Sequence, residues 1–94
     1  MNWPYHRVFS VELGKPHHLR PGRVERSVDD VPVPYPHALA IETLRNLADE
    51  DEYVIVLLDQ DGCPLTHSHP YDLDDAFADC EYEFGVRRDE WAAK

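Results

Sequence analysis

The segment 66–72 holds the residue types that come closest to a chemical site in this chain. Its sequence is THSHPYD, and residues i and i+2 of a strand point to the same side, so His67 and His69 would present two imidazoles together, as metal ligands do. Asp72 could supply a third ligand. Metallohydrolases with a His-x-His-x-Asp-His motif need a histidine directly after the aspartate, whereas Asp72 lies one residue too late and precedes a leucine. We therefore predict no metal and no other cofactor, and we keep a small metal-dependent protein or enzyme using His67, His69 and Asp72 as the alternative.

Other catalytic groups lack the surroundings that would activate them. No serine lies in a Gly-x-Ser-x-Gly turn, and the four glycines are too isolated to form a phosphate-binding loop. The two cysteines form no Cys-x-x-Cys pair; Cys63 follows a turn glycine, and Cys80 falls on the apolar stripe of a predicted helix. So few cysteines in a small chain are typical of thiols in a reducing compartment. We expect that the protein is not an enzyme.

The clearest helix of the sequence spans residues 73–84. Asp72 is a typical N-cap, with Asp75 three residues later, and Gly85 is a typical C-terminal cap. The apolar residues recur at helical spacing and form one stripe, which consists of Leu73, Ala76, Phe77, Cys80 and Phe84. Acidic residues occupy most of the remaining helix surface.

The acidic side of this helix is the candidate binding surface. Aromatic residues within a charged field are typical of protein–protein interfaces, and two tyrosines interrupt the acids here. The residues that we predict to contact a protein partner are Tyr71, Asp75, Asp79, Tyr82 and Glu83. The alternative is that these acids form only the solvated face of the helix.

The charge of the chain favours one class of partner. Residues 1–28 carry a net charge of +3 and residues 29–94 a net charge of −13, which gives −10 for the whole chain. A protein with this net charge repels phosphate backbones, so we expect no nucleic-acid partner. It attracts basic proteins, so a basic protein is the expected partner. The longest apolar run, residues 53–58, is far shorter than the roughly 20 residues that span a bilayer, so we expect no membrane partner.

A hairpin must precede the helix. Residues 53–58 (YVIVLL) are apolar at every position, which is typical of a central strand covered on both faces, and a homodimer would be one way to supply the second cover. Asp61-Gly62 is a strong two-residue turn. Counting outward from it predicts the pairs Leu58–Leu65, Val56–His67 and Val54–His69, with Leu65, His67 and His69 on one face.

The first half supplies three further elements. Alternation predicts a strand over residues 5–13 and an edge strand over 23–28, with a Pro/Gly-rich loop between them. Prolines 32, 34 and 36 predict an extended connector, and the apolar spacing that follows predicts a helix over 36–48, stopped by four acids at 49–52. The expected order is β-β-α-β-β-α, a small α+β fold with a mostly antiparallel sheet.

The length of the chain and its N-terminal residues bear on domain number and location. A chain of 94 residues has the size of one domain, so residues 1–94 are expected to form a single unit. The N-terminal MNWPYHR has no charged leader followed by an apolar segment, so we expect no secretory signal and a cytoplasmic location.

The C-terminal third carries a resemblance. It runs from Thr66 through DLDDA at residues 72–76 to EYEFGV at residues 81–86 and Trp91. It resembles the tail of short uncharacterised bacterial proteins whose last helix ends in a similar EFGV, with a tryptophan a few residues later. The resemblance implies a shared fold and no particular activity. In size and charge the chain is also similar to immunity proteins that block toxins, so we expect a non-catalytic interaction module of an immunity-like or regulatory kind.

Overall fold

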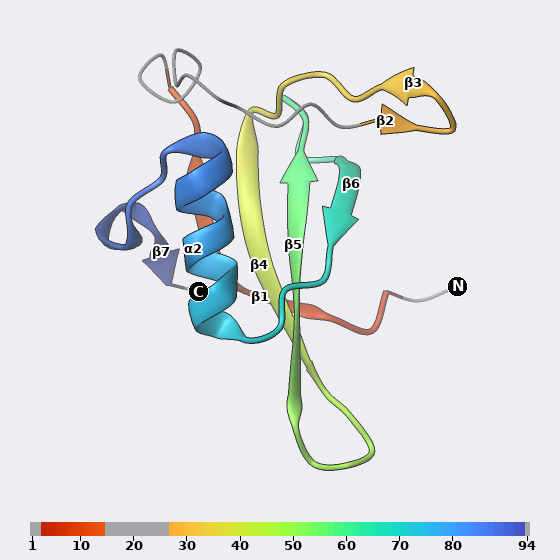
Figure 1. The fold of residues 1–94 in the computed structure, drawn as a ribbon, viewed down its shortest axis with the longest axis vertical. Helices are drawn as coiled ribbons and strands as arrows, with labels where there is room; N and C mark the ends of the chain where they lie inside the picture. The colour runs from red at the N-terminus through yellow and green to blue at the C-terminus, as the bar shows by residue number, and fades with distance from the viewer. Residues whose placement is uncertain (1–2, 15–26, 94) are drawn as a thin grey trace.

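The computed structural model describes residues 3–14 and 27–93. Its main element is a five-stranded antiparallel sheet with the strand order β6-β5-β4-β1-β7 (Figure 1). These strands are β1 (His6–Glu12), β4 (Ala38–Arg45), β5 (Asp51–Leu58), β6 (Pro64–Ser68) and β7 (Ala92–Ala93). The helix α2 (Leu73–Phe84) covers one face of the sheet, and a short 3-10 helix, η1 (Arg88–Glu90), leads into β7. The expected α+β class with a mostly antiparallel sheet is confirmed.

The predicted helix over residues 36–48 is wrong, and with it the order β-β-α-β-β-α. Residues 38–45 form β4, the middle strand of the sheet, which pairs with β1 on one side and β5 on the other. The segment ALAIETLR has good helix formers, but it also alternates: Leu39 and Ile41 point toward α2, whereas Ala40 and Glu42 point to the opposite face. Two ladders of backbone hydrogen bonds and burial on both faces outweigh the helix propensity.

The helix over 73–84 is confirmed at both ends. The Asp72 side chain accepts a hydrogen bond from the backbone N–H of Asp75 at 2.8 Å, which is the predicted N-cap. Gly85 ends the helix in the left-handed conformation at φ 73°, where its missing Cβ avoids strain. The apolar stripe of α2 packs on Leu39, Ile41, Ile55 and Leu57, and Val86 and Trp91 fold back against the same core as expected.

The hairpin between β5 and β6 is confirmed, with one change of register. Val56 pairs with His67 as predicted, but Leu58 pairs with Pro64 because a bulge interrupts the ladder. The bulge turns Leu65 toward the α2 side, where it packs against the core, so Leu65 and His67 do not share a face as predicted. The connection is also longer than two residues, because β5 ends at Leu58 and β6 begins at Pro64. Within it, the Asp59 side chain accepts hydrogen bonds from the N–H groups of Asp61 and Cys63.

Both faces of β5 are covered within one chain. Residues Val54 to Leu58 are all buried, as the apolar run predicts. On the face opposite α2, Ala40, Val54, Val56 and Leu58 form a second apolar cluster, against which Tyr5 and Ala38 pack. Burial of this strand therefore does not require the second copy that the sequence had raised as one solution.

The remaining predictions concern the first half of the chain, before β4. The strand expected at 5–13 is β1, and the end of the expected edge strand is β2 (Ser27–Val28), which forms a separate hairpin with β3 (Val31–Pro32). Residues 33–37 are the irregular connector that the prolines predict. Residues 23–26 of the edge strand and residues 15–22 of the loop lie outside the described residues. In the described ranges, no helix has the length and apolar character needed to cross a membrane.

Candidate functional site

Four of the five predicted contact residues lie on the exposed side of α2 or just before it. Asp75, Asp79 and Tyr82 are all exposed, and their spacing of four and three residues places them along one outward line, here called the α2 stripe. Tyr71 precedes the helix and is 90% exposed, and Tyr82 is 69% exposed. Both rings are therefore accessible to a partner, and tyrosines are common at protein–protein interfaces.

Glu83 is the exception, because it is buried with only 7% of its surface exposed. It follows Cys80 by three residues and Ala76 by seven, so it lies over the apolar stripe that packs on the sheet. Glu83 therefore does not lie on the exposed side with the other four residues, and its contact with a partner stays a prediction. We had assigned Glu83 to the binding surface because it is acidic, without weighing its position on the helix.

A hollow of about 500 Å³ lies next to Tyr71, between the β4–β5 hairpin and the connection that enters α2. We call it the acidic hollow, because four carboxylates line it: those of Glu50, Asp51, Glu52 and Asp72. Tyr53, His69 and Tyr71 contribute rings to its wall. None of the described residues that line it is a lysine or an arginine.

The local sequence shapes the hairpin side of the hollow. The Asn46 side chain accepts hydrogen bonds from the N–H groups of Ala48 and Glu50, at 2.9 and 3.1 Å, which folds the turn tightly. Asp49 takes a positive φ of 62°, a conformation that aspartate tolerates better than most residues. Arg45 pairs with Asp49 at 3.1 Å and with Asp51 at 3.4 Å, so part of the acid run is neutralised from outside the hollow.

Glu52 holds a further contact at the edge of the hollow. The hydroxyl of Tyr5 donates a hydrogen bond to Glu52 Oε1 at 3.4 Å. Burial, followed by the negative charge of Glu52 and this hydrogen bond, raises the pKa of Tyr5 above its ordinary value. The phenol therefore stays protonated, and the hydrogen bond links the N-terminal segment to the rim of the hollow.

The residue types at this hollow suit positive charge. Carboxylates can accept hydrogen bonds from an ammonium or guanidinium group, and aromatic rings beside them can add cation–π attraction, although Asp51 already pairs with Arg45 and Asp72 caps α2. Asp72 joins the hollow to the α2 stripe, because it lines the one and caps the helix that carries the other. The sequence pointed to Tyr71 and the α2 acids, but it missed Glu50, Asp51 and Glu52, which it had interpreted as a helix stop.

The structure places two residues of the metal alternative side by side and the third apart, as the cap of α2. His67 and His69 lie edge to face with ring centroids 5.2 Å apart, and His67 also lies against Trp3 at 5.6 Å. Asp72 is engaged as the helix cap. Among the described residues, no three His, Cys, Asp or Glu side chains come close enough together to hold one ion. Neither cysteine is in a disulfide; Cys63 is exposed and Cys80 is buried.

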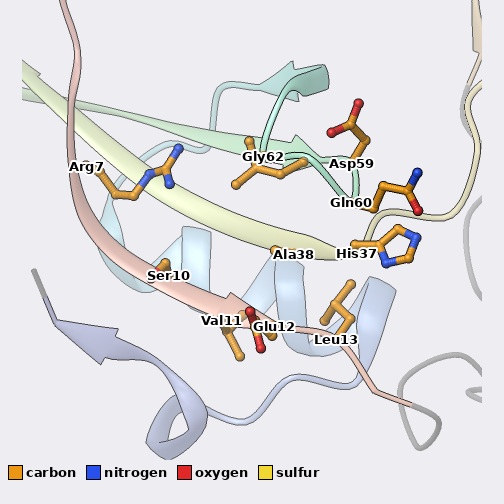
Figure 2. A pocket seen from close by; sticks show the side chains of 11 residues that line it. Arg7, Ser10, Val11, Glu12, Leu13, His37, Ala38, Asp59, Gln60 and Gly62 are labelled. Carbon is orange, nitrogen blue, oxygen red and sulfur yellow. The ribbon is translucent and has the colours of Figure 1, made fainter.

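A second group of polar residues lies on the sheet face opposite α2, and we did not find it from the sequence. Glu42 is buried there and bonded to Trp3 and Arg7. Figure 2 shows this face with α2 behind the sheet and Arg7 reaching from β1 across β4. A lone acid within an apolar strand is the signal that could have revealed the site, but it was hidden because the segment was interpreted as a helix.

Comparison with protein-family models, with curated proteins and with solved structures finds no match for this chain. The resemblance of the C-terminal third to short bacterial proteins therefore stays a sequence-based prediction.

Proposed function

We propose that this protein is a non-catalytic interaction module, immunity-like or regulatory, that binds a basic segment of another protein through the acidic hollow and the α2 stripe. The observation that supports the proposal is the acidic hollow, a space of about 500 Å³ whose lining includes four acidic residues, two tyrosines and no lysine or arginine among the described residues. A lysine or arginine side chain of a partner has the charge and the length to enter such a space.

The charge of the whole protein supports the same partner. With 19 acidic and nine basic residues, the protein attracts a basic partner over distances comparable to the Debye length, about 10 Å at 0.1 M salt. The carboxylates supply the attraction, and the exposed ring of Tyr71 supplies apolar contact area at the same place. This combination supports a binding surface over the alternative of an acidic face that is merely solvated.

A titration with a basic peptide tests the proposal. The probe is a fluorescein-labelled peptide of alternating lysine and serine, and its fluorescence anisotropy is measured as the protein is added. We expect saturable binding that weakens as salt rises. Replacing Glu50 and Glu52 by glutamine should weaken binding about fivefold, since two charge pairs of about 0.5 kcal/mol each are lost. Tyr71→Ala should weaken it further by raising the dissociation rate.

The control removes the same charge elsewhere. Asp29 and Asp30 form the turn between β2 and β3, at the other end of the molecule from the β4–β5 hairpin (Figure 1). Both have positive φ values, 52° and 65°, which asparagine also accepts, so Asp29→Asn/Asp30→Asn should leave the turn intact. If this control weakens peptide binding as much as the Glu50/Glu52 pair does, then net charge and not the acidic hollow attracts the peptide, and the proposal fails.

A cytoplasmic location belongs to the same proposal. The exposed free thiol of Cys63 suits a reducing compartment, since an exposed cysteine is prone to oxidation or pairing elsewhere.

A further inference from the structure

A separate hollow lies on the sheet face opposite α2. It has a volume of about 370 Å³, near the lower end of the range for small-molecule sites. Its floor includes Val56 and Leu58, and its walls include the rings of Trp3 and His67. Because a mostly apolar hollow with a few polar groups is the usual form of a small-molecule site, the polar groups decide what it could bind. We call it the Trp3 pocket.

Glu42 serves to fix this pocket rather than to receive a ligand. Its side chain is only 8% exposed, and both of its oxygens are engaged. Oε1 accepts a hydrogen bond from the Trp3 indole N–H, and Oε2 accepts from Nε and Nη2 of Arg7, both at 3.3 Å. The buried carboxylate thereby holds an aromatic wall and a cation in place.

Arg7 is the polar group that faces the open space. A guanidinium has five N–H donors, and the bonds to Glu42 use two of them. The side chain is 36% exposed and lines both the Trp3 pocket and a neighbouring hollow of about 410 Å³ (Figure 2). A carboxylate is the group that a partly exposed guanidinium binds best, in a paired geometry.

The aromatic walls specify the rest of the ligand. The Trp3 ring is half-exposed. It contacts Tyr5 with centroids 5.1 Å apart and His67, edge to face, with centroids 5.6 Å apart, so two neighbouring rings hold it in a defined orientation. The exposed part of the Trp3 ring can contact a planar ligand that also covers the apolar floor. We propose that the Trp3 pocket binds a small aromatic carboxylate of one or two rings, with its carboxylate on Arg7 and its ring against Trp3.

The two tryptophans allow a direct test with an internal control. Trp91 packs against Phe77 on the α2 side of the sheet, so its indole N–H resonance should not respond to a ligand on the other face. The full chain, labelled with ¹⁵N, is titrated with 2-naphthoate. We expect the Trp3 indole resonance to shift saturably while that of Trp91 stays fixed. Equal drift of the two resonances, or no saturation at millimolar naphthoate, would overturn the proposal.

Changes in the probe test the role of Arg7 without a variant. On the unaltered protein, 2-naphthalenemethanol and 2-naphthylmethylamine should bind at least about tenfold more weakly than 2-naphthoate, because neither places a carboxylate on the guanidinium.

Two variants test Arg7 directly. Arg7→Gln should cause a similar loss of affinity for naphthoate, whereas Arg45→Gln, a matched change at the far end of β4, should alter that affinity less than about twofold. Tighter binding of the amine would reverse the assigned charge and sink the proposal. A Trp3 shift that depends on protein concentration alone would place a second copy of the chain in the pocket and also refute it.

Discussion

The two faces of the sheet are built from neighbouring positions of the same strands, yet they differ in composition. The face under α2 is packed mainly with apolar side chains, including Phe84, Leu39 and Ile55, and Glu83 of α2 is a buried acid beside them. The opposite face has an apolar floor but also buries the charged side chain of Glu42, paired with Arg7. One face is therefore built mainly for stability, whereas the other gives up part of its apolar packing for polar groups and open space.

The largest effect is expected on the face under α2. Phe84 is 2% exposed and packs edge-on against Tyr35, so Phe84→Ala removes a buried aromatic ring and leaves a cavity. We predict a loss of about 3–5 kcal/mol in the free energy of unfolding, measured by urea denaturation. Tyr82→Ala, two residues earlier on the same helix, should change it by less than about 0.5 kcal/mol because that ring is exposed. Similar losses for both would mean that the helix is not oriented as described.

A smaller effect is expected from the ion pair on the opposite face. Arg7→Met leaves the buried carboxylate of Glu42 without its cation, and we predict a loss of about 1–3 kcal/mol, less than for a fully buried pair because Arg7 is partly exposed. The double variant Arg7→Met/Glu42→Leu should regain most of that loss, since an apolar pair avoids the desolvation of both charges. A double-mutant cycle measures this recovery. If the two losses simply add, the pair does not interact as the structure indicates.

The smallest effect concerns Tyr5, which packs on the opposite face and donates to Glu52. Its pKa is raised in the folded state by burial and by Glu52, so the folded protein holds the phenol proton more tightly than the unfolded chain does. The resulting stabilisation is fully present below pH about 10 and is lost as pH rises through the raised pKa. The unfolding free energy of the parent should therefore fall in alkali relative to that of Tyr5→Phe, and a difference that stays constant from neutral to alkaline pH would contradict the raised pKa of Tyr5.

The two helix predictions show where sequence reasoning succeeds and where it stops. α2 carries its own signals, namely a capping aspartate, a single apolar stripe and a terminal glycine, so its local preference and its tertiary role agree. The segment 38–45 satisfies both periods, because its apolar residues fit a helix face and also alternate as a strand requires. Only its pairing with β1 and β5, which are distant in the sequence, decides between them.

The candidate surface was also predictable only in part, namely where it depends on α2 and not on the sheet. Tyr71 and the α2 stripe follow from the helix, whose outward side can be read from the positions of its core residues. The hairpin acids follow from the register of β4 and β5, so the error at 36–48 concealed the acidic hollow. Glu83 was misplaced because seven residues separate it from Ala76, a spacing that returns it to the buried side.

The most direct test of basic-segment binding at the acidic hollow is to map where a basic peptide contacts the protein. The measurement is the set of backbone amide chemical-shift changes in the ¹⁵N-labelled protein when the lysine–serine peptide is added. The proposed function predicts that the largest changes fall on the hairpin acids at 50–52 and on Tyr71 and Asp72, continue along the α2 stripe, and fade as salt is raised. Changes of similar size at the β2–β3 turn, or changes confined to residues away from the acidic hollow, would contradict it.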